Sequence, residues 1–359
     1  MRLLKVHVLY ECGGDGRPHG CGEIRLIRPL SYPSIKDEIQ LTYGTDVPQS
    51  NVDIVVVERL WDNHRRNPAL LMSELCALKK KGVKIIYEID DDLLSVNSDI
   101  GVRLFPSTTQ RMWIREVARL ADGIIVSTPN LASRFKSLNK NIVIVQNALD
   151  DTLFNDAVRL NMIASSKKPI VFGYMGTPTH FEDLLLILQP LRSILFEFRE
   201  SVQLEIVGVG DSSMLKSLFP NLPVTLRQVP TSAVSYVKFV NWMQSNLRWD
   251  FGIAPLVNST FTSSKSDIKY LDYGVQGIPS IFSNVPAYNN TIKHGVNGLL
   301  ADNSVESWVQ CLRMMINDKT LRSNLAAEAH SHILDSRLLK TQSNNWVDAL
   351  RRLIAHPLV

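Results

Sequence analysis

Val52-Asp-Ile-Val-Val-Val57 and Val83-Lys-Ile-Ile-Tyr-Glu-Ile89 are two short apolar runs with a helical segment, Pro68–Lys81, between them. Leucines recur along one face of that segment, Pro68 suits a first helical turn, and Gly82 suits the residue that ends a helix. Strands this rich in β-branched residues are typical of a parallel sheet that helices cover on both faces.

The same alternation of strand and helix extends in both directions along the chain. Further strands are expected at Val6–Tyr10, Gly123–Ser127, Asn141–Gln146, Ile170–Tyr174, Gln203–Val207, Val224–Arg227, Phe251–Pro255, Ser280–Phe282 and Gly298–Ala301. Further helices are expected at Thr109–Leu120, Pro129–Leu138, Phe181–Phe198, Ser212–Leu218, Ser232–Ser245, Asp267–Gln276, Ser304–Ile316, Lys319–Ser331 and Arg337–Ile354. The pattern pauses in the polar stretch from Asn147 to Pro169. We therefore predict an α/β protein with two Rossmann-like, doubly wound parallel-sheet domains, 1–150 and 151–336, that face each other across a cleft.

Length and composition agree with two globular domains. The 359 residues are 45% apolar and 21% charged, which excludes a disordered chain, a collagen-like chain and a disulfide scaffold. The 39 Lys and Arg exceed the 35 Asp and Glu by four, so we expect no nucleic acid as a partner. Four cysteines favour a reducing compartment. Because no apolar run approaches the ~20 residues that cross a bilayer and Met1–Tyr10 is typical of a strand rather than a signal peptide, we expect a cytoplasmic protein.

In open parallel sheets, ligands bind beyond the carboxyl ends of the strands, so the residues that follow each strand are candidates for a site. In the second half, Gly176, Thr177 and His180 follow the strand Ile170–Tyr174. Glycine at this point lets the backbone approach a phosphate, and the next helix begins with N–H groups that favour anions. The alternatives are that the glycine serves packing and that His180 is a helix cap or a core residue.

The segment Ser264-Lys265-Ser266-Asp267 follows the strand Phe251–Pro255 and precedes a helix. Ser266 is the expected N-cap of that helix. The backbone N–H groups of Ser266 and Asp267, together with the Lys265 ammonium, are suited to a diphosphate.

Asp272 lies further along the same expected helix. A carboxylate near a phosphate-binding helix can accept hydrogen bonds from ribose hydroxyls. The alternative is a solvated helix on which Lys269 and Asp272 form a surface pair.

Three runs in the C-terminal half carry a more specific signal. They are Lys269-Tyr-Leu-Asp272-Tyr-Gly-Val-Gln-Gly277-Ile-Pro279, Asn284-Val-Pro-Ala-Tyr288 and His294-Gly-Val-Asn297-Gly298. These runs resemble the nucleotide-sugar glycosyltransferases of family 4. Asp122-Gly-Ile-Ile-Val-Ser127-Thr128 and Asn147-Ala-Leu-Asp150 are similar to that family's route into its interdomain linker.

The resemblance implies a retaining, metal-independent glycosyltransferase of the GT-B fold. Domain 151–336 would bind the nucleotide-diphosphate sugar and domain 1–150 would lie on the acceptor side. The final helix of this fold often returns to the first domain, so 337–359 is expected to pack there. The implied substrates are a UDP-, GDP- or dTDP-sugar and a saccharide or lipid-linked glycan acceptor, with no further cofactor. The sequences of Gly173–Asp183 and Lys265–Asp272 most resemble those of bacterial enzymes of surface polysaccharide (O-antigen or capsule) synthesis.

The donor half departs from the family's pattern at two places. The Glu-x7-Glu motif of the family falls on Ser264 and Asp272, so a carboxylate is kept at the second position alone. The Arg and Lys with which the family binds the diphosphate fall near Thr177 and His180. We expect Lys265 to supply the missing positive charge.

Three carboxylates, Asp90, Asp91 and Asp92, directly follow the strand Val83–Ile89. Like charges this close raise one another's pKa unless a cation or hydrogen bonds intervene. The family's His in this domain falls on Asp90 and Asp91, either of which could orient an acceptor hydroxyl or accept its proton, so both are candidate catalytic residues. The alternative is a capped turn beside Arg59 or Arg103. An Asp-x-Asp metal site of the GT-A type would leave the C-terminal resemblance unexplained.

A glycine-rich loop, Glu11–Glu23, follows the first expected strand. Cys12, His19 and Cys21 lack a fourth ligand at a finger-like spacing, so no metal is expected. The arginines near this loop can contact an acceptor or can face solvent. The candidate acceptor-side residues are Gly13, Gly14, Arg25 and Arg59.

Basic clusters at Lys79–Lys81 with Lys84, and at Arg65-Arg66, suit a peripheral contact with the anionic inner membrane. The alternative is that they are solvated helix ends. The tryptophans Trp61, Trp113 and Trp242 are expected in the core rather than on a rim.

The departures from the family leave a second class of function open. It is a non-catalytic GT-B-like binding subunit of a glycosyltransferase complex. The shared two-domain fold also leaves open a sugar-nucleotide epimerase.

Overall fold

The computed structural model describes residues 2–49, 51–61, 66–96, 105–154, 169–209 and 212–355. The chain forms two compact units. The first comprises Met1–Asp151, Ser263–Ser266 and Leu338–Val359, and the second comprises Thr152–Thr262 and Asp267–Arg337. Each unit contains one six-stranded sheet.

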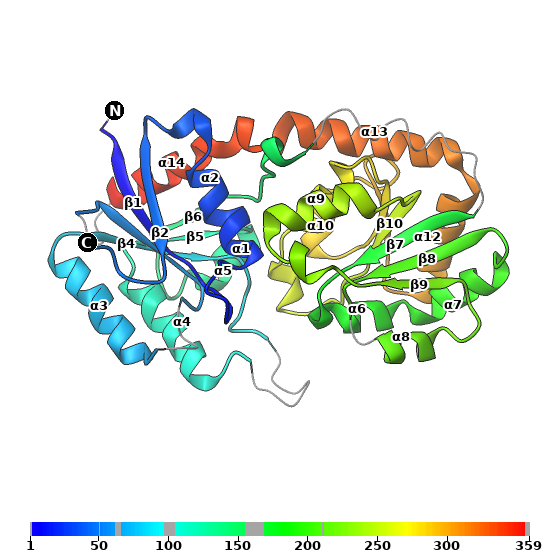
Figure 1. The fold of residues 1–359 in the computed structure, drawn as a ribbon, viewed down its shortest axis with the longest axis horizontal. Helices are drawn as coiled ribbons and strands as arrows, with labels where there is room; N and C mark the ends of the chain where they lie inside the picture. Colours follow the sequence, from blue (N-terminus) through cyan, green and yellow to red (C-terminus); the bar gives the residue numbers. More distant parts are fainter. Residues whose placement is uncertain are drawn as a thin grey trace. The chain divides into compact units, whose positions relative to one another are not determined.

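The sheet of the first unit is parallel throughout and has the order β2-β1-β3-β4-β5-β6 (Figure 1). Its strands are β1 (Leu4–Leu9), β2 (Ile39–Gly44), β3 (Ile54–Glu58), β4 (Lys84–Ile89), β5 (Gly123–Val126) and β6 (Ile142–Ile144). The direction of winding reverses at β1, because β2 lies on one side of it and β3 on the other. The carboxyl ends of β1 and β3 therefore flank the topological switch point, where open α/β sheets bind ligands.

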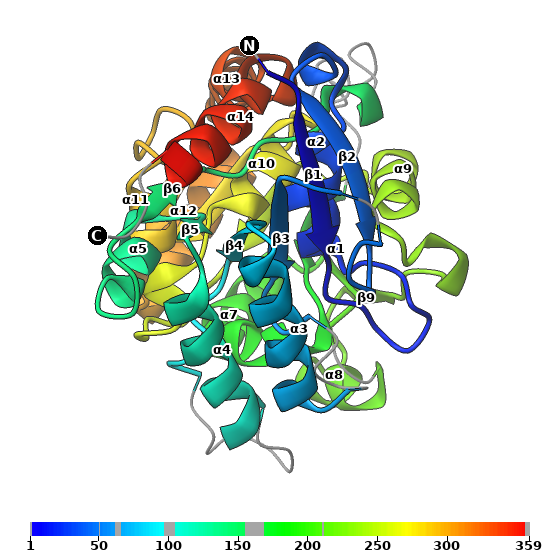
Figure 2. The same ribbon diagram turned by 90° about the vertical axis from the view of Figure 1, so that its left-hand side faces the viewer.

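Successive residues of the strands face opposite sides of this sheet. Val55 and Val57 pack in the core that contains α3 (Pro68–Lys80), α4 (Thr108–Leu120) and α5 (Pro129–Phe135). Ile54 and Val56 pack in a second core with α14 (Leu339–Ala355) and with the helical stretch made of α1 (Gly20–Gly22), a π-helical turn (Glu23–Ile27) and α2 (Arg28–Leu30). Figures 1 and 2 show α3 and α4 on one side of the sheet and α14, drawn in red, on the other.

The second sheet is also parallel and has the order β12-β11-β10-β7-β8-β9. Its strands are β7 (Ile170–Met175), β8 (Val202–Val207), β9 (Val224–Arg227), β10 (Phe251–Ala254), β11 (Ser280–Ser283) and β12 (Leu299–Ala301). Counted within the unit, this is the Rossmann order, with its switch point between β7 and β10.

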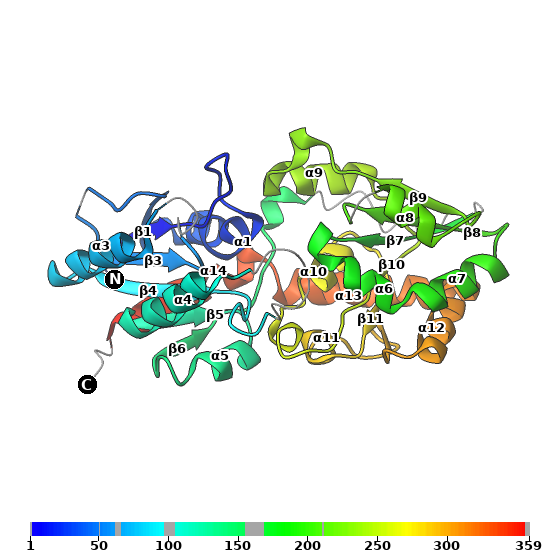
Figure 3. The same ribbon diagram turned by 90° about the horizontal axis from the view of Figure 1, so that it is seen from below.

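The two faces of the second sheet are packed differently. Long apolar side chains cover one face, and on the other face the Trp249 ring packs directly on the backbone of Gly173. Phe172 and Tyr174 pack in the core with α6 (Phe181–Leu186), α7 (Leu188–Glu197), α8 (Ser212–Leu218), α12 (Val305–Asn317) and α13 (Lys319–Ser336). Figures 1 and 3 show α7 beside α12. On the opposite face, a Cβ at Gly173 would lie 1.9 Å from the Trp249 ring. The remaining helices of this unit are α9 (Tyr236–Asn246), α10 (Ile268–Gly274) and α11 (Pro286–Asn289).

The predicted fold class of two Rossmann-like parallel-sheet domains is confirmed. The strand β2 was not expected, because it lies at the edge of its sheet and most of its side chains stay partly or fully exposed. The segment expected as one helix, Phe181–Phe198, is divided at Ile187 into α6 and α7. Ser263–Ser266 lies with the first unit, although the boundaries drawn from the sequence assign it to the second.

The final helix α14 belongs to the first unit. Its first residue, Leu339, donates a backbone hydrogen bond to the Leu149 carbonyl. Trp61 and Trp113 are buried, as expected, and each ring N–H donates to a backbone carbonyl. Trp242 is half-buried and stacks on Phe239. Among the helices of the described ranges, none has both the length and the apolar character needed to cross a membrane.

A methyl group at Gly173 tests the close contact in the second unit. Gly173→Ala places a Cβ inside the Trp249 ring position, so we expect the free energy of unfolding to fall by about 3 kcal/mol. Gly14→Ala is the matched control, because a Cβ there meets nothing within 4 Å. Urea denaturation measures both variants. Equal stability of the two would contradict the packing described for β7.

Candidate functional site

Arg25 lies at the centre of a buried polar network in the first unit. Its Nε donates to Glu88 Oε1 at 2.8 Å, and its Nη1 donates to the Val145 carbonyl at 2.6 Å and to Asn147 Oδ1 at 2.9 Å. The guanidinium carbon lies 4.7 Å from the centre of the Trp346 ring. With 1% of Arg25 exposed, the prediction that it contacts an acceptor is wrong. Burial of the ion pair and its hydrogen bonds make Arg25 a structural residue.

The Arg25 network extends into the segment Ser263–Ser266. Asn147 Nδ2 donates to Ser266 Oγ at 2.8 Å, and Thr128 Oγ1 donates to the Ser264 carbonyl at 2.9 Å. Ser266 is therefore not the N-cap of the next helix. Asp267 occupies that position without a side-chain cap bond, and α10 begins at Ile268.

Two carboxylic acids meet at the switch point of the first unit. Glu11 follows β1, and its backbone N–H donates to Glu58 Oε2 at 2.8 Å. Burial, then the nearby charges of Glu88 and Glu11, raise the pKa of Glu58 well above its ordinary value. The neutral form of Glu58 is therefore favoured more than that of an exposed glutamate. A Cβ at Gly22 would lie 2.7 Å from Glu58 Oε2, so glycine is required there for the close approach.

Arg59 follows Glu58 and places a positive charge at the switch point of the first unit. Its Nε lies 3.1 Å from Glu11 Oε2, and its Nη1 lies 3.4 Å from Asp90 Oδ1. Its side chain is 15% exposed. The prediction placed Arg59 among the acceptor-side residues together with Gly13 and Gly14, which lie in the loop after β1 with Gly14 exposed.

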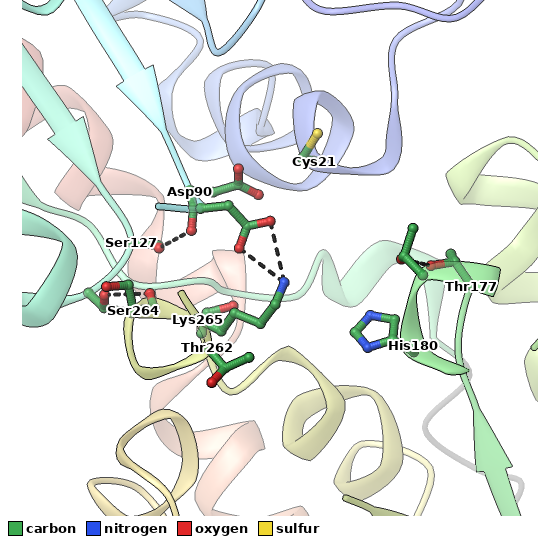
Figure 4. Close-up of polar contacts among 12 residues, drawn as sticks. Cys21, Asp90, Ser127, Thr177, His180, Thr262, Ser264 and Lys265 are labelled. Carbon is green, nitrogen blue, oxygen red and sulfur yellow. Dashed lines mark hydrogen bonds and ion pairs between the residues drawn. The ribbon is translucent and has the colours of Figure 1, made fainter. Parts of the chain in front are cut away.

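Each of the three aspartates after β4 has its own cationic partner. Asp90 lies beside Arg59, and Asp92 accepts from Arg134 Nε at 2.9 Å. Asp91 accepts from Lys265 Nζ at 3.2 Å. Figure 4 shows the labelled Lys265, whose ammonium has dashed lines to a carboxylate near the labelled Asp90.

Of these carboxyls, Asp90 has a pKa that is raised by burial despite the opposing charge of Arg59. The alternative of a turn beside Arg59 has support, since Leu93 N donates to the Asp91 carbonyl and Ser127 Oγ to the Asp90 carbonyl. Arg103 and Arg65 lie outside the described residues.

Two expected donor contacts are occupied by the protein itself. Ser264 is 1% exposed, so its hydroxyl is enclosed and cannot replace a glutamate toward a sugar. The Asp267 carboxylate accepts from Arg337 Nη1 at 2.7 Å, from Arg337 Nη2 at 2.8 Å and from Thr291 Oγ1 at 2.7 Å. The side chain of Asp267 is therefore structural. That its backbone N–H binds a diphosphate stays a prediction.

The loop after β7 reaches the switch point of the second unit. Gly176 N donates to the Val207 carbonyl at 3.1 Å. At the end of β8, Gly208 has a φ of 76°, and a Cβ there would lie 2.6 Å from the Gly176 carbonyl oxygen. Two glycines thus let the carboxyl ends of β7 and β8 approach closely. Thr177 follows as an exposed residue whose hydroxyl is hydrogen-bonded to that of Thr179 (Figure 4).

His180 is oriented by a carboxylate. Its Nδ1 lies 2.8 Å from Asp183 Oδ2. Asp183 is buried, and its Oδ1 accepts from the Val257 N–H at 2.9 Å. Because Val257 follows β10, Asp183 ties together the loops on the two sides of the switch point. The ring is partly exposed, which a core histidine would not be.

Asp272 on α10 has a carboxylate that accepts no hydrogen bond from any described residue. Burial raises its pKa from 3.8 to about 7, and the charge of Lys269 opposes that shift. Lys269 is itself buried, with its ammonium 5.4 Å from the centre of the Tyr174 ring. The alternative of a solvated surface pair is therefore wrong, and Asp272 keeps its acceptor capacity for a ligand.

Several residues of the two switch points were not predicted as site residues. A charged residue that ends a β-branched run is the signal for two of them, since a carboxyl group is almost never buried unless a partner is present. His-x-x-Asp spacing at a helix start is the signal for a third. The residues are Glu11, Glu58, Glu88 and Asp183. In the described part of the chain, no three His, Cys, Asp or Glu side chains come together as a metal site.

Comparisons with known proteins bear on the fold. No protein-family model and no curated protein matches this sequence. The solved structure of Anabaena HepE with UDP-glucose matches over 97% of this chain and 99% of its own, with a TM-score of 0.66 and 13% identity. A glycosyltransferase from Rickettsia africae matches over 98% of this chain and 99% of its own, with a TM-score of 0.65 and 13% identity.

The chain has the GT-B fold. TarM matches 82% of this chain with a TM-score of 0.58 and 14% identity, and the chain spans 54% of TarM. Because the GT-B fold combines two Rossmann-like domains, each switch point described above is a candidate binding site in its own unit.

The raised pKa of Asp272 predicts a pH-dependent stability. The folded-state pKa, about 7, lies above the ordinary value of 3.8, so the stability linked to this group is full at low pH and is lost as pH rises through about 7. Asp272→Asn should therefore raise the unfolding free energy by up to about 4 kcal/mol at pH 8 and by much less at pH 4. Thermal unfolding at both pH values measures this. Asp348→Asn, at an exposed position on α14, is the control. A pH-independent effect of Asp272→Asn would contradict the assignment.

Proposed function

We propose that this protein is a retaining glycosyltransferase that moves a sugar from a nucleotide-diphosphate donor to a saccharide or lipid-linked acceptor in surface polysaccharide synthesis. The observation that carries the proposal is the unpaired acceptor capacity of Asp272 beside the Rossmann switch point of the second unit. HepE has been solved with UDP-glucose, and GtfA with UDP and GlcNAc, which supports a nucleotide sugar as the donor.

The nucleoside would bind the second unit. The close glycine turn at Gly176 and Gly208 leaves room for the backbone to approach a phosphate. Thr177 offers a hydroxyl, and His180 offers a ring whose orientation Asp183 fixes. Asp272 would accept hydrogen bonds from the ribose hydroxyls, which favour its ionised form.

Lys265 would supply positive charge to the diphosphate. It lies three residues before α10 and is paired with Asp91 in this structure. When the sugar leaves, charge develops on the diphosphate oxygen and an ammonium group nearby stabilises it. We propose that the ammonium exchanges Asp91 for the donor's phosphate, without a metal ion.

The acceptor would bind the first unit at the switch point between β1 and β3. Asp90 is the better candidate base, because burial raises its pKa, which suits a group that accepts a proton, whereas the Lys265 ammonium engages Asp91. In the transfer, the acceptor O–H proton moves to Asp90 and the acceptor oxygen bonds to the anomeric carbon. The bond from that carbon to the diphosphate oxygen breaks, and its electron pair leaves with the nucleoside diphosphate.

A peripheral contact with an anionic membrane is proposed for the end of α3. Lys79 donates to the Leu120 carbonyl, and both Lys79 and Lys84 lie near Asp122. Lys80 and Lys81 are exposed and are the residues that such a contact would use.

Nucleotide binding tests the donor assignment. A thermal-shift screen with UDP, GDP and dTDP should raise the melting temperature with one of them, because that ligand binds the folded state alone. Calorimetry with that nucleotide should show an affinity that decreases as Asp272 becomes protonated. Below about pH 6 the decrease should approach a factor of ten for each pH unit. Asp272→Ala should weaken binding by about tenfold at pH 8, and Lys265→Ala should weaken it by a similar factor.

The control for this experiment is Asp348→Ala, which removes an exposed carboxylate on α14. Normal binding by both the Asp272 and Lys265 variants would overturn the donor site. Incubation of the wild type with nucleotide sugars and candidate acceptors then measures transfer. Binding without turnover of any donor would favour a non-catalytic subunit instead, and conversion of the donor without an acceptor would favour an epimerase.

Sedimentation with vesicles tests the membrane contact. Each lysine near an anionic surface contributes ~1 kcal/mol, so Lys80→Gln with Lys81→Gln should lower binding to phosphatidylglycerol vesicles by roughly 30-fold. The control is Lys216→Gln with Lys238→Gln, which changes the charge equally at exposed positions in the second unit. An equal effect of both double variants, or no binding by the wild type, would contradict the contact.

A further inference from the structure

Arg59 has a backbone conformation that its side chain does not favour. Its φ is 39°, and in the described ranges Asn221 is the other non-glycine residue with a positive φ. L-residues with a Cβ pay free energy for this left-handed region. Such conformations persist where the surroundings fix them, and they cluster at functional sites. Arg59 lies at such a place, directly after β3 at the switch point of the first unit.

The backbone of Arg59 is fixed from three sides. Its N–H donates to the Glu88 carbonyl at 2.9 Å. Its own carbonyl accepts from Tyr87 Oη at 3.0 Å and from Trp113 Nε1 at 3.2 Å. Both of these aromatic side chains are buried, and they come from β4 and α4. Two side-chain donors on one carbonyl hold the strained turn in a single conformation.

The side chain of Arg59 is fixed as well. Its Nε lies 3.1 Å from Glu11 Oε2, while its Nη1 lies 3.4 Å from Asp90 Oδ1 and donates to Cys21 Sγ at 3.4 Å. Glu11 follows β1, Cys21 lies in α1 and Asp90 follows β4. The guanidinium thus connects three elements at the carboxyl edge of one sheet.

We propose that Arg59 is a positioning residue that holds the Asp90 carboxylate in place, and in its ionised form, for the acceptor hydroxyl. The inference rests on the proposed glycosyl transfer and extends it, because it assigns the geometry of the base to a residue that need not touch either substrate. The Asp91 pair with Lys265 cannot take this role for Asp90, because it engages the neighbouring carboxylate.

The charge on Asp90 depends on several neighbours. Burial raises its pKa, Arg59 is the strongest opposing influence, and Asp91 raises it while Arg25 and Lys265 lower it. The pKa of Glu58 is raised well above its ordinary value by burial, and the pKa of the Cys21 thiol is raised well above its ordinary value by burial and by Glu58. The titratable and charged groups that face Asp90 or Arg59 from the packed elements are Glu11, Cys21, Arg25, Glu58, Tyr87, Glu88, Asp91 and Lys265.

Two substitutions separate the charge of Arg59 from its backbone. Arg59→Gly removes the guanidinium at a φ that glycine adopts without strain, so the fold is kept. Arg59→Lys keeps a positive charge but loses the planar group that reaches two carboxylates. The control is Arg134→Ala, which removes the partner of Asp92 in the same aspartate run.

The experiment measures the pH profile of kcat for sugar transfer and, separately, the titration of Asp90 by carboxyl ¹³C NMR, assigned with Asp90→Asn. Arg59→Gly should move the acid limb of kcat and the Asp90 titration to higher pH by about one unit. It should lower kcat at pH 7 by about 100-fold with the donor KM unchanged. Arg59→Lys should restore part of both effects, and Arg134→Ala should change neither.

A loss of rate in Arg59→Gly with an unmoved acid limb and an unmoved Asp90 titration would overturn the proposal, because a merely structural residue gives that result. A wild-type rate in Arg59→Gly would overturn it too. If the wild type transfers no sugar, the proposed function is wrong, but the proposed role of Arg59 is not yet decided. The NMR titration then still decides whether Arg59 holds Asp90, since it needs no substrate.

Discussion

The buried ion pair between Arg25 and Glu88 is the constraint on which the site of the first unit depends. It joins the π-helical turn after β1 to β4 across 63 positions of sequence, and it continues through Asn147 to Ser266. Removal of one partner from such a pair leaves a buried charge, which costs more than the pair itself contributes. The pair therefore ties the π-helical turn to β4 two residues before Asp90.

Each unit has a parallel sheet with a switch point, but different residue types lie at the two switch points. In the first unit the switch point collects carboxyl groups, of which Glu58 has a pKa raised by burial and Asp90 lies beside Arg59. In the second unit the switch point collects glycine turns, an oriented imidazole at His180 and the unpaired carboxylate of Asp272. In the proposed function, the acid-rich site would bind a hydroxyl acceptor and the glycine-rich site would bind a phosphate.

The fold was predictable because apolar runs and their spacing report burial directly. The positions of the aspartates after β4 and of Asp272 within α10 were predictable for the same reason, since both elements are recognisable in the sequence. Contacts between distant segments could not be predicted from the sequence, because periodicity does not indicate which buried cation pairs with which carboxylate. Arg25 was therefore assigned to an acceptor, and Ser264 and Ser266 to the donor, although all three are enclosed or engaged within the first unit. The left-handed turn at Arg59 has no sequence signal, because its residue is not glycine.

We propose that the second unit binds the nucleoside diphosphate at its Rossmann switch point. Hydrogen–deuterium exchange with saturating UDP, GDP or dTDP tests this proposal most directly, because it locates the bound nucleotide along the chain. With the nucleotide that binds, we expect slower exchange of the amides at Gly176–Asp183 and Ile268–Gly274. Slower exchange confined to the loop Glu11–Glu23 and the turn at Arg59, or no change with any of the three nucleotides, would contradict it.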